Sequence, residues 1–76
     1  MIDTNNLGRK IAEARHRVKL TQTSLAAKVG VTAQAVSKWE QGRSCPDIAI
    51  LDEIADALGI SLFELLGMDE RTQSSS

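Results

Sequence analysis

Residues 20–42 constrain the fold of this chain most strongly, because they read as two short helices joined by a tight turn. Thr21 and Thr32 stand where a helix N-cap is expected, since a hydroxyl there accepts a hydrogen bond from an exposed backbone N–H. Gly30 separates the two segments, and glycine adopts a positive φ at little steric cost. We therefore expect helices over about residues 22–29 and 33–41, crossing at a steep angle.

The second helix of this pair has two unlike faces. At about 100° per residue, one face is apolar and holds Ala35, Val36 and Trp39. The opposite face is polar and carries no carboxylate; its members are Gln34, Ser37, Lys38 and Gln41. Because Gln and Lys side chains pair with base edges and phosphates, this face suits the major groove of DNA. The spacing of Trp39 favours a place in the core over stacking on a base.

The remaining segments also follow a helical period. The first, running to about Val18 and capped by Asn5 or Asn6, has the 4-3-4 apolar spacing Leu7, Ile11, Ala14 and Val18. Asp47 caps a helix that reaches about Leu58, before Gly59. Ser61 and Glu64 form a capping box for a short fifth helix that buries Leu62, Leu65 and Leu66. The fold class predicted is all-α, with five helices.

Length and composition agree with one small domain. The chain has 76 residues, 42% of them hydrophobic but only 3% aromatic, so aliphatic side chains must build the core. We divide it into a flexible N-terminus (1–5), the helical domain (6–67) and a polar, Ser-rich tail (68–76), which is a linker or a frayed terminus. The first residues lack the pattern of a secretory signal, and no apolar run approaches the length of a membrane span, so we expect a cytoplasmic protein.

Catalysis finds little support in the residue types present. One His, one Cys and no Tyr leave no nucleophile–base set, and neither a metal-ligand spacing nor a phosphate-binding Gly loop occurs. The single cysteine, Cys45, excludes an intramolecular disulfide. His16 is expected to be solvated. We predict that the chain is not an enzyme and needs no cofactor or metal.

The charges divide unevenly along the chain. Residues 1–46 hold eight Lys and Arg against three Asp and Glu, a net charge of +5, whereas residues 47–76 hold one Arg against seven acids, a net charge of −6. Such asymmetry is one mark of a nucleic-acid surface on one side of a domain. The acidic side of the fourth helix, with Asp52, Glu53 and Asp56, is most often only a solvated face.

Taken in order, the motifs resemble those of the lambda-repressor/Cro-like helix-turn-helix family. The matching residues run from Leu20-Thr21-Gln22 through Leu25-Ala26, Val29-Gly30-Val31, Val36-Ser37, Trp39-Glu40 and Gly42 to Pro46, Leu51, Ile54-Ala55 and Leu58. They cover about residues 7–66. The resemblance implies a five-helix domain whose helix at 33–41 enters the major groove. It also implies a transcription regulator, expected to be a repressor, that binds a two-fold symmetric site as a homodimer.

The resemblance also implies individual contacts with double-stranded DNA. The base-facing positions are Thr32, Ala33, Gln34, Ser37 and Lys38, and the phosphate-facing positions are Thr21, Gln22, Gln41 and Arg43. Gln34 suits a bidentate pair with adenine. Gln22 also matches a glutamine that braces a side chain of the recognition helix. Ala33 departs from the family, where a longer polar side chain is common, so apolar contact with a thymine methyl, or no readout, is expected there.

Two features are assigned other roles. Arg15 and Glu40 match a family ion pair between the first and third helices, and we expect this pair to be structural. Phe63 and Met68 are either ordinary core or edge residues or part of a dimer patch. A rival function from another class stays open: an adaptor or antitoxin-like module on the same scaffold, binding a protein partner through its acidic C-terminal half.

Overall fold

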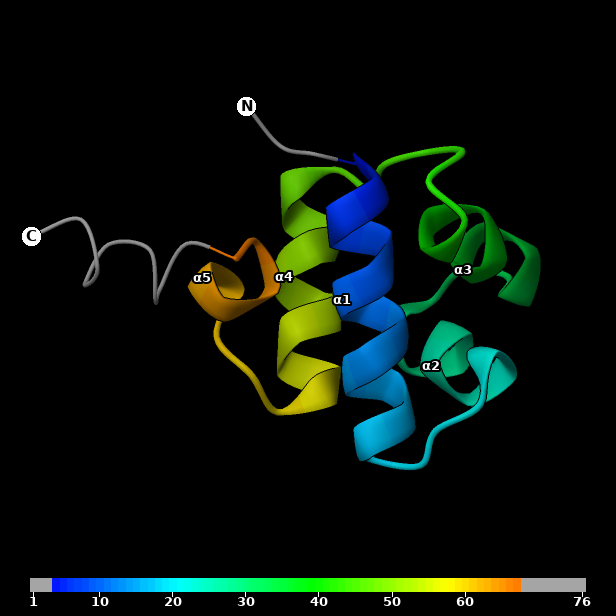
Figure 1. Ribbon diagram of the computed structural model, residues 1–76. Helices are drawn as coiled ribbons and strands as arrows, with labels where there is room; N and C mark the ends of the chain where they lie inside the picture. The colour runs from blue at the N-terminus through cyan, green and yellow to red at the C-terminus, as the bar shows by residue number, and fades with distance from the viewer. Residues whose placement is uncertain (1–3, 68–76) are drawn as a thin grey trace, which may run out of the picture.

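The computed structural model describes residues 4–67. Five helices occur in this range, namely α1 (Thr4–Arg17), α2 (Gln22–Val29), α3 (Ala33–Glu40), α4 (Ile48–Leu58) and α5 (Leu62–Leu65), and these residues form no strand. α1 and α4 lie side by side, with α2 and α3 on one side of them and α5 on the other (Figure 1). The predicted all-α, five-helix fold with a helix-turn-helix is confirmed.

Four helices begin at a side-chain N-cap that the sequence predicts. The oxygens of Thr21, Thr32, Asp47 and Ser61 each accept a hydrogen bond from the backbone N–H three residues further on. These bonds satisfy donors that the first helical turn leaves without a partner. The capping box of α5 is half formed, because the Glu64 carboxylate lies 3.9 Å from Arg17 Nη1 instead of turning back to Ser61.

The start of α1 differs from the prediction, whereas its end lies one residue before the predicted Val18. The helix begins at Thr4, so Asn5 and Asn6 lie inside it and do not cap it. It ends at Arg17, because Lys19 takes the left-handed conformation (φ 62°) and Leu20 N–H bonds back to the Arg15 carbonyl. Val18 therefore leaves the apolar stripe and is 43% exposed. Residues 1–3 and the proposed tail 68–76, with Met68, lie outside the described residues.

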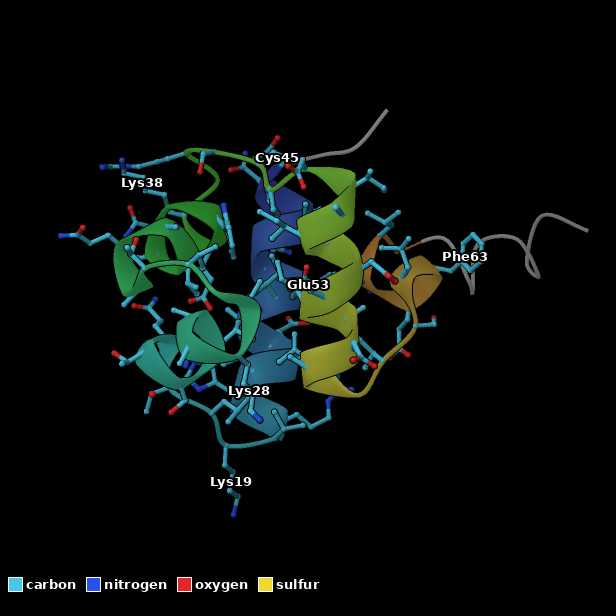
Figure 2. The ribbon with its side chains drawn as sticks, turned by 180° about the vertical axis from the view of Figure 1, so that it is seen from behind. Lys19, Lys28, Lys38, Cys45, Glu53 and Phe63 are labelled. Carbon is cyan, nitrogen blue, oxygen red and sulfur yellow. The ribbon has the colours of Figure 1, made fainter. Side chains whose placement is uncertain are left out.

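Some apolar side chains lie at the surface. Phe63 on α5 is 62% exposed and projects away from the helix pair of α1 and α4 (Figure 2), and Ile48 at the start of α4 is equally exposed. Leu65 is fully buried, whereas Leu62 and Leu66, also expected to be buried, are half-buried at the edge of the core.

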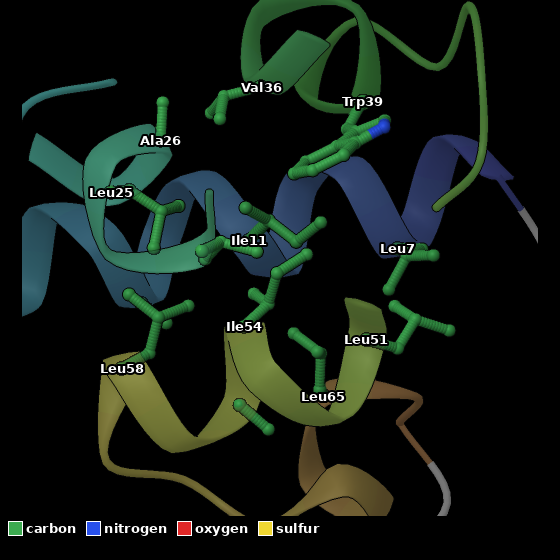
Figure 3. Packing of buried hydrophobic residues seen from close by; sticks show 13 residues of the cluster. Leu7, Ile11, Leu25, Ala26, Val36, Trp39, Leu51, Ile54, Leu58 and Leu65 are labelled. Atoms are coloured by element: carbon green, nitrogen blue, oxygen red, sulfur yellow. The ribbon is translucent and has the colours of Figure 1, made fainter. Parts of the chain in front are cut away.

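The core lies between α1, α2, α3 and α4 and is closed by α5 (Figure 3). Its fully buried side chains are Ile11, Leu25, Val36, Leu51, Ile54, Leu58 and Leu65. Trp39 lies with its ring over α1 and is 6% exposed, so its predicted place in the core is confirmed. Burial of these aliphatic side chains is the main force that holds such short helices together.

Candidate nucleic-acid interface

The turn between α2 and α3 is defined by backbone bonds and two caps. Gly30 has φ 81°, and its N–H and that of Val31 both bond to the Ala26 carbonyl, at 2.8 and 3.0 Å. Val31 then packs against the core, and Thr32 caps α3. Because residues on both sides of the turn bond to or pack against buried residues, the turn fixes the direction of α3 relative to α2.

α3 also lies unusually close to α1. Gly8 is buried in α1, and a Cβ atom on it would overlap the carbonyl oxygen of Trp39 and come within 2.9 Å of that of Glu40. Only a residue without a side chain allows the last turn of α3 to approach α1 this closely. This role of Gly8 could not be predicted from the sequence, since a glycine inside a helical pattern gives no indication of what lies opposite it.

Arg15 and Glu40 form the expected ion pair between α1 and α3. Arg15 Nε donates to Glu40 Oε2 at 2.7 Å, and Nη2 donates to Oε1 at 3.1 Å. Both side chains are about nine-tenths buried. The pKa of Arg15 is raised above its usual value, mainly by the hydrogen bond to Glu40 and against the cost of burial. Nη1 also donates to the Leu20 carbonyl at 2.9 Å, which ties the loop before α2 to the same side chain.

Gln22, the first residue of α2, joins this network. Its Nε2 donates to Glu40 Oε1 at 3.0 Å, so it braces α3 at its C-terminal end. The second N–H of the amide is not used in that bond. The N-terminal N–H groups of α2 lie beside it, where a helix offers donors and a partial positive charge to an anion.

The polar face of α3 points away from the core. Gln34, Lys38 and Gln41 are exposed, while Ala33 and Ser37 are half-buried. Lys38 extends from α3 into open space (Figure 2). Gln41 Nε2 donates to Ser37 Oγ at 2.9 Å, which connects one residue assigned to bases with one assigned to phosphates.

The flanking positions are less uniform. Arg43 is exposed in the loop after α3. The Thr32 hydroxyl accepts from Ala35 N–H at 3.1 Å as the cap of α3. The Thr21 hydroxyl accepts from Ser24 N–H and donates its only hydrogen to Ser24 Oγ, both at 3.0 Å. The hydrogen of the Ser24 hydroxyl is not used in these two bonds, and Ser24 was not among the predicted contacts.

Two further properties concern only residues 4–67. No group of three or more His, Cys, Asp or Glu comes together there in a way that would hold a metal ion. No helix in that range has the length and apolar content needed to cross a membrane.

Known proteins share this arrangement. The helix-turn-helix family model matches residues 11–65. An uncharacterised HTH-type transcriptional regulator of Sinorhizobium fredii is 36% identical over 66 residues, covering 87% of this chain and 86% of that protein. Multiprotein-bridging factor 1 of Debaryomyces hansenii is 37% identical over 57 residues, covering 75% of this chain but 38% of that protein.

Among solved structures, the P22 c2 repressor in complex with a synthetic operator superposes with a TM-score of 0.77 at 33% identity, covering 83% of this chain and 96% of that one. The present chain spans about half the length, or less, of several of its curated relatives.

Proposed function

Because the chain belongs to the lambda-repressor/Cro-like helix-turn-helix family, we propose that it binds double-stranded DNA sequence-specifically and regulates transcription, as a repressor. The observation that carries the proposal is the outward face of α3, which is polar, free of carboxylates and rigidly held by the core and by Arg15. Repression follows from occupancy, since a bound protein blocks other proteins from the same DNA. A DNA target also fits the cytoplasmic location expected from the sequence.

In this proposal, α3 lies in the major groove with Gln34 and Lys38 facing base edges. Gln34 is exposed near the N-terminus of α3, the end that usually approaches bases most closely. Its amide matches the donor–acceptor pattern of adenine, and Lys38 matches guanine or a phosphate. Thr32 and Ala33 lie where the helix begins, so Ala33 is suited to contact with a thymine methyl.

Phosphate contacts hold the register. Gln22, the backbone N–H groups that begin α2, and Arg43 lie on either side of α3 along the chain and supply donors without sequence preference. Thr21 shapes this end of α2 as its cap. Binding should weaken steeply with salt, because phosphate neutralisation releases counterions.

The first experiment is a titration of the full chain against random-sequence duplex DNA at low salt, followed by selection and sequencing of the bound sites. We expect retention of DNA and enrichment of a defined site. Absence of binding at low salt would contradict the proposal.

Two variants separate the two kinds of contact. Gln34→Ala should change the base preferred at one position of the selected site, with a loss of about 1–3 kcal/mol of discrimination. Arg43→Ala should weaken binding to all sequences alike and reduce the salt slope by about one. The proposed division of roles fails if Arg43→Ala changes the selected sequence instead.

We also propose that two copies bind a two-fold symmetric site, with half-sites separated by roughly 34 Å or a multiple of it. The exposed Phe63 on α5 lies on the far side of the α1–α4 pair from α3, where a second copy leaves the recognition helix free (Figure 2). The adaptor function is not favoured, because two relatives that match over 86% and 71% of their own length are both named HTH-type transcriptional regulators.

A further inference from the structure

Gln41 and Ser37 are joined on the outward face of α3. Gln41 Nε2 donates to Ser37 Oγ at 2.9 Å, across the four-residue spacing that places two side chains one above the other on a helix. Gln41 is exposed and Ser37 is half-buried, so the bond lies at the surface that the proposed function turns toward DNA.

The backbone around Gln41 gives its side chain a defined direction. Its N–H bonds to the Ser37 carbonyl at 3.0 Å, and the next two N–H groups, those of Gly42 and Arg43, bond to the carbonyls of Trp39 and Lys38 at 3.1 and 2.9 Å. Gly42 takes the left-handed conformation (φ 77°) that closes a helix in this way. A side chain on a fixed backbone, with its amide held by a neighbour, loses little conformational entropy when it binds.

Gln41 also lies in line with Gln34. Seven residues make nearly two helical turns, so the two amides occupy the same outward ridge, about 10 Å apart along the axis at 1.5 Å per residue. Successive base pairs are separated by about 3.4 Å. A helix lying along the groove therefore places Gln34 and Gln41 about three base pairs from each other.

Resting on the proposed function, we propose that Ser37 and Gln41 form a single recognition unit and that Gln41 determines specificity at a base pair of its own. The Ser37 oxygen already accepts from Gln41, which leaves its O–H as a donor, and the Gln41 carbonyl oxygen stays free as an acceptor. Adenine presents the complementary pair in the major groove, the N7 acceptor and the N6 donor. A phosphate presents only acceptors, so it would take the second Nε2 hydrogen or the Ser37 O–H and leave the Gln41 carbonyl to water.

The test is site selection with the wild-type chain and with Gln41→Ala, Ser37→Ala and the double variant. Each single variant should lose the preference for adenine at the same position, about three base pairs from the position that Gln34→Ala alters. We expect a loss of discrimination of roughly tenfold at that position. The double variant should lose no more than the larger single loss, because both side chains serve one contact.

Glu53→Gln on the exposed face of α4 is the matched control, and it should leave the selected site unchanged. Thermal melting of each variant checks that the fold is retained. The inference is overturned if Gln41→Ala weakens all sequences alike and lowers the salt slope, since Gln41 is then a phosphate contact. Effects of Ser37→Ala and Gln41→Ala at different positions, or additive effects, would also overturn it. A wild-type chain that binds no DNA contradicts the proposed function itself, which distinguishes the two failures.

Discussion

A single guanidinium, that of Arg15, connects three segments of the chain. It bonds both oxygens of Glu40 and the carbonyl of Leu20, and through Glu40 it reaches Gln22. Glu40 ends α3, where a negative charge opposes the helix dipole, so the carboxylate contributes to tertiary structure at the expense of its own helix. The pair itself follows from the family resemblance. The resemblance also implies that Gln22 braces a side chain of α3, and the bond from Gln22 to Glu40 agrees with that. The bond from Arg15 to the Leu20 carbonyl does not follow from the resemblance, because it depends on how the loop before α2 is placed.

Arg15→Met should lower the free energy of unfolding by about 3 kcal/mol, because it leaves the buried Glu40 carboxylate without its cation. Urea denaturation measures the change. The double variant Arg15→Met/Glu40→Leu should recover part of the lost stability, since it leaves no unpaired charge in the buried site. A double variant less stable than Arg15→Met would contradict this reading.

Lys19 occupies a backbone conformation that disfavours its side chain. At φ 62°, a glycine relieves the contact between Cβ and the following carbonyl. Lys19→Gly should therefore raise the free energy of unfolding by about 0.5–1 kcal/mol, measured by urea denaturation. Lys28→Gly, inside α2, should lower it by about 1 kcal/mol as the opposite control. The prediction fails if both variants lose stability equally. Nothing in the apolar spacing of α1 signals the turn at Lys19, so the spacing alone places Val18 on the apolar face of the helix.

At the scale of helices, the approach of α1 to α3 positions the recognition helix. Apolar spacing and N-caps were enough to predict α2, α3 and α4 with nearly their observed bounds, because these signals lie within each segment. The closeness of α1 and α3 could not be predicted, since it arises from the Gly8 backbone meeting carbonyls more than thirty residues away in sequence. The base and phosphate assignments of individual side chains stay predictions.

Gly8→Ala should lower the free energy of unfolding by about 2–3 kcal/mol, because the new Cβ overlaps a carbonyl oxygen and forces α1 and α3 apart. DNA affinity should fall as well, even in the folded fraction. Gly59→Ala is the control: a Cβ there meets nothing within 4 Å, so only the positive φ of 73° opposes it, at a cost of about 1 kcal/mol. Equal losses from the two variants, measured by thermal and urea unfolding, would argue against a steric role for Gly8.

At the scale of the whole molecule, the charge asymmetry of the sequence maps onto separate elements. The basic half supplies α1, α2 and α3, and the acidic half supplies α4 and α5. A net charge of −1 is therefore compatible with attraction to DNA from one side, because residues 1–46 carry only three of the ten acids. The orientation in which the protein approaches DNA is therefore expected to depend on where its charges lie and not on its net charge.

Phe63→Asp should weaken binding to a two-fold symmetric site while leaving the affinity for a single half-site within about twofold, because it places a charge in the proposed contact between copies. Titrations against DNA with one and two half-sites measure the difference, and Ile48→Asp on α4 is a comparison at an equally exposed apolar position. Equal losses on both DNAs would place Phe63 outside a dimer contact.

The first turn of α1 lies directly against the end of the recognition helix. A Cβ on Gly42 would overlap the side chain of Asn5, so these two segments leave no room between them. Any bulky group attached just ahead of Thr4, such as an affinity tag or a fluorescent protein, begins beside the proposed DNA-binding surface. α5, by contrast, lies on the opposite side of the α1–α4 pair, where the contact between copies is proposed (Figure 1). An N-terminal fusion that binds DNA poorly would therefore show the effect of its tag and not a property of the protein itself.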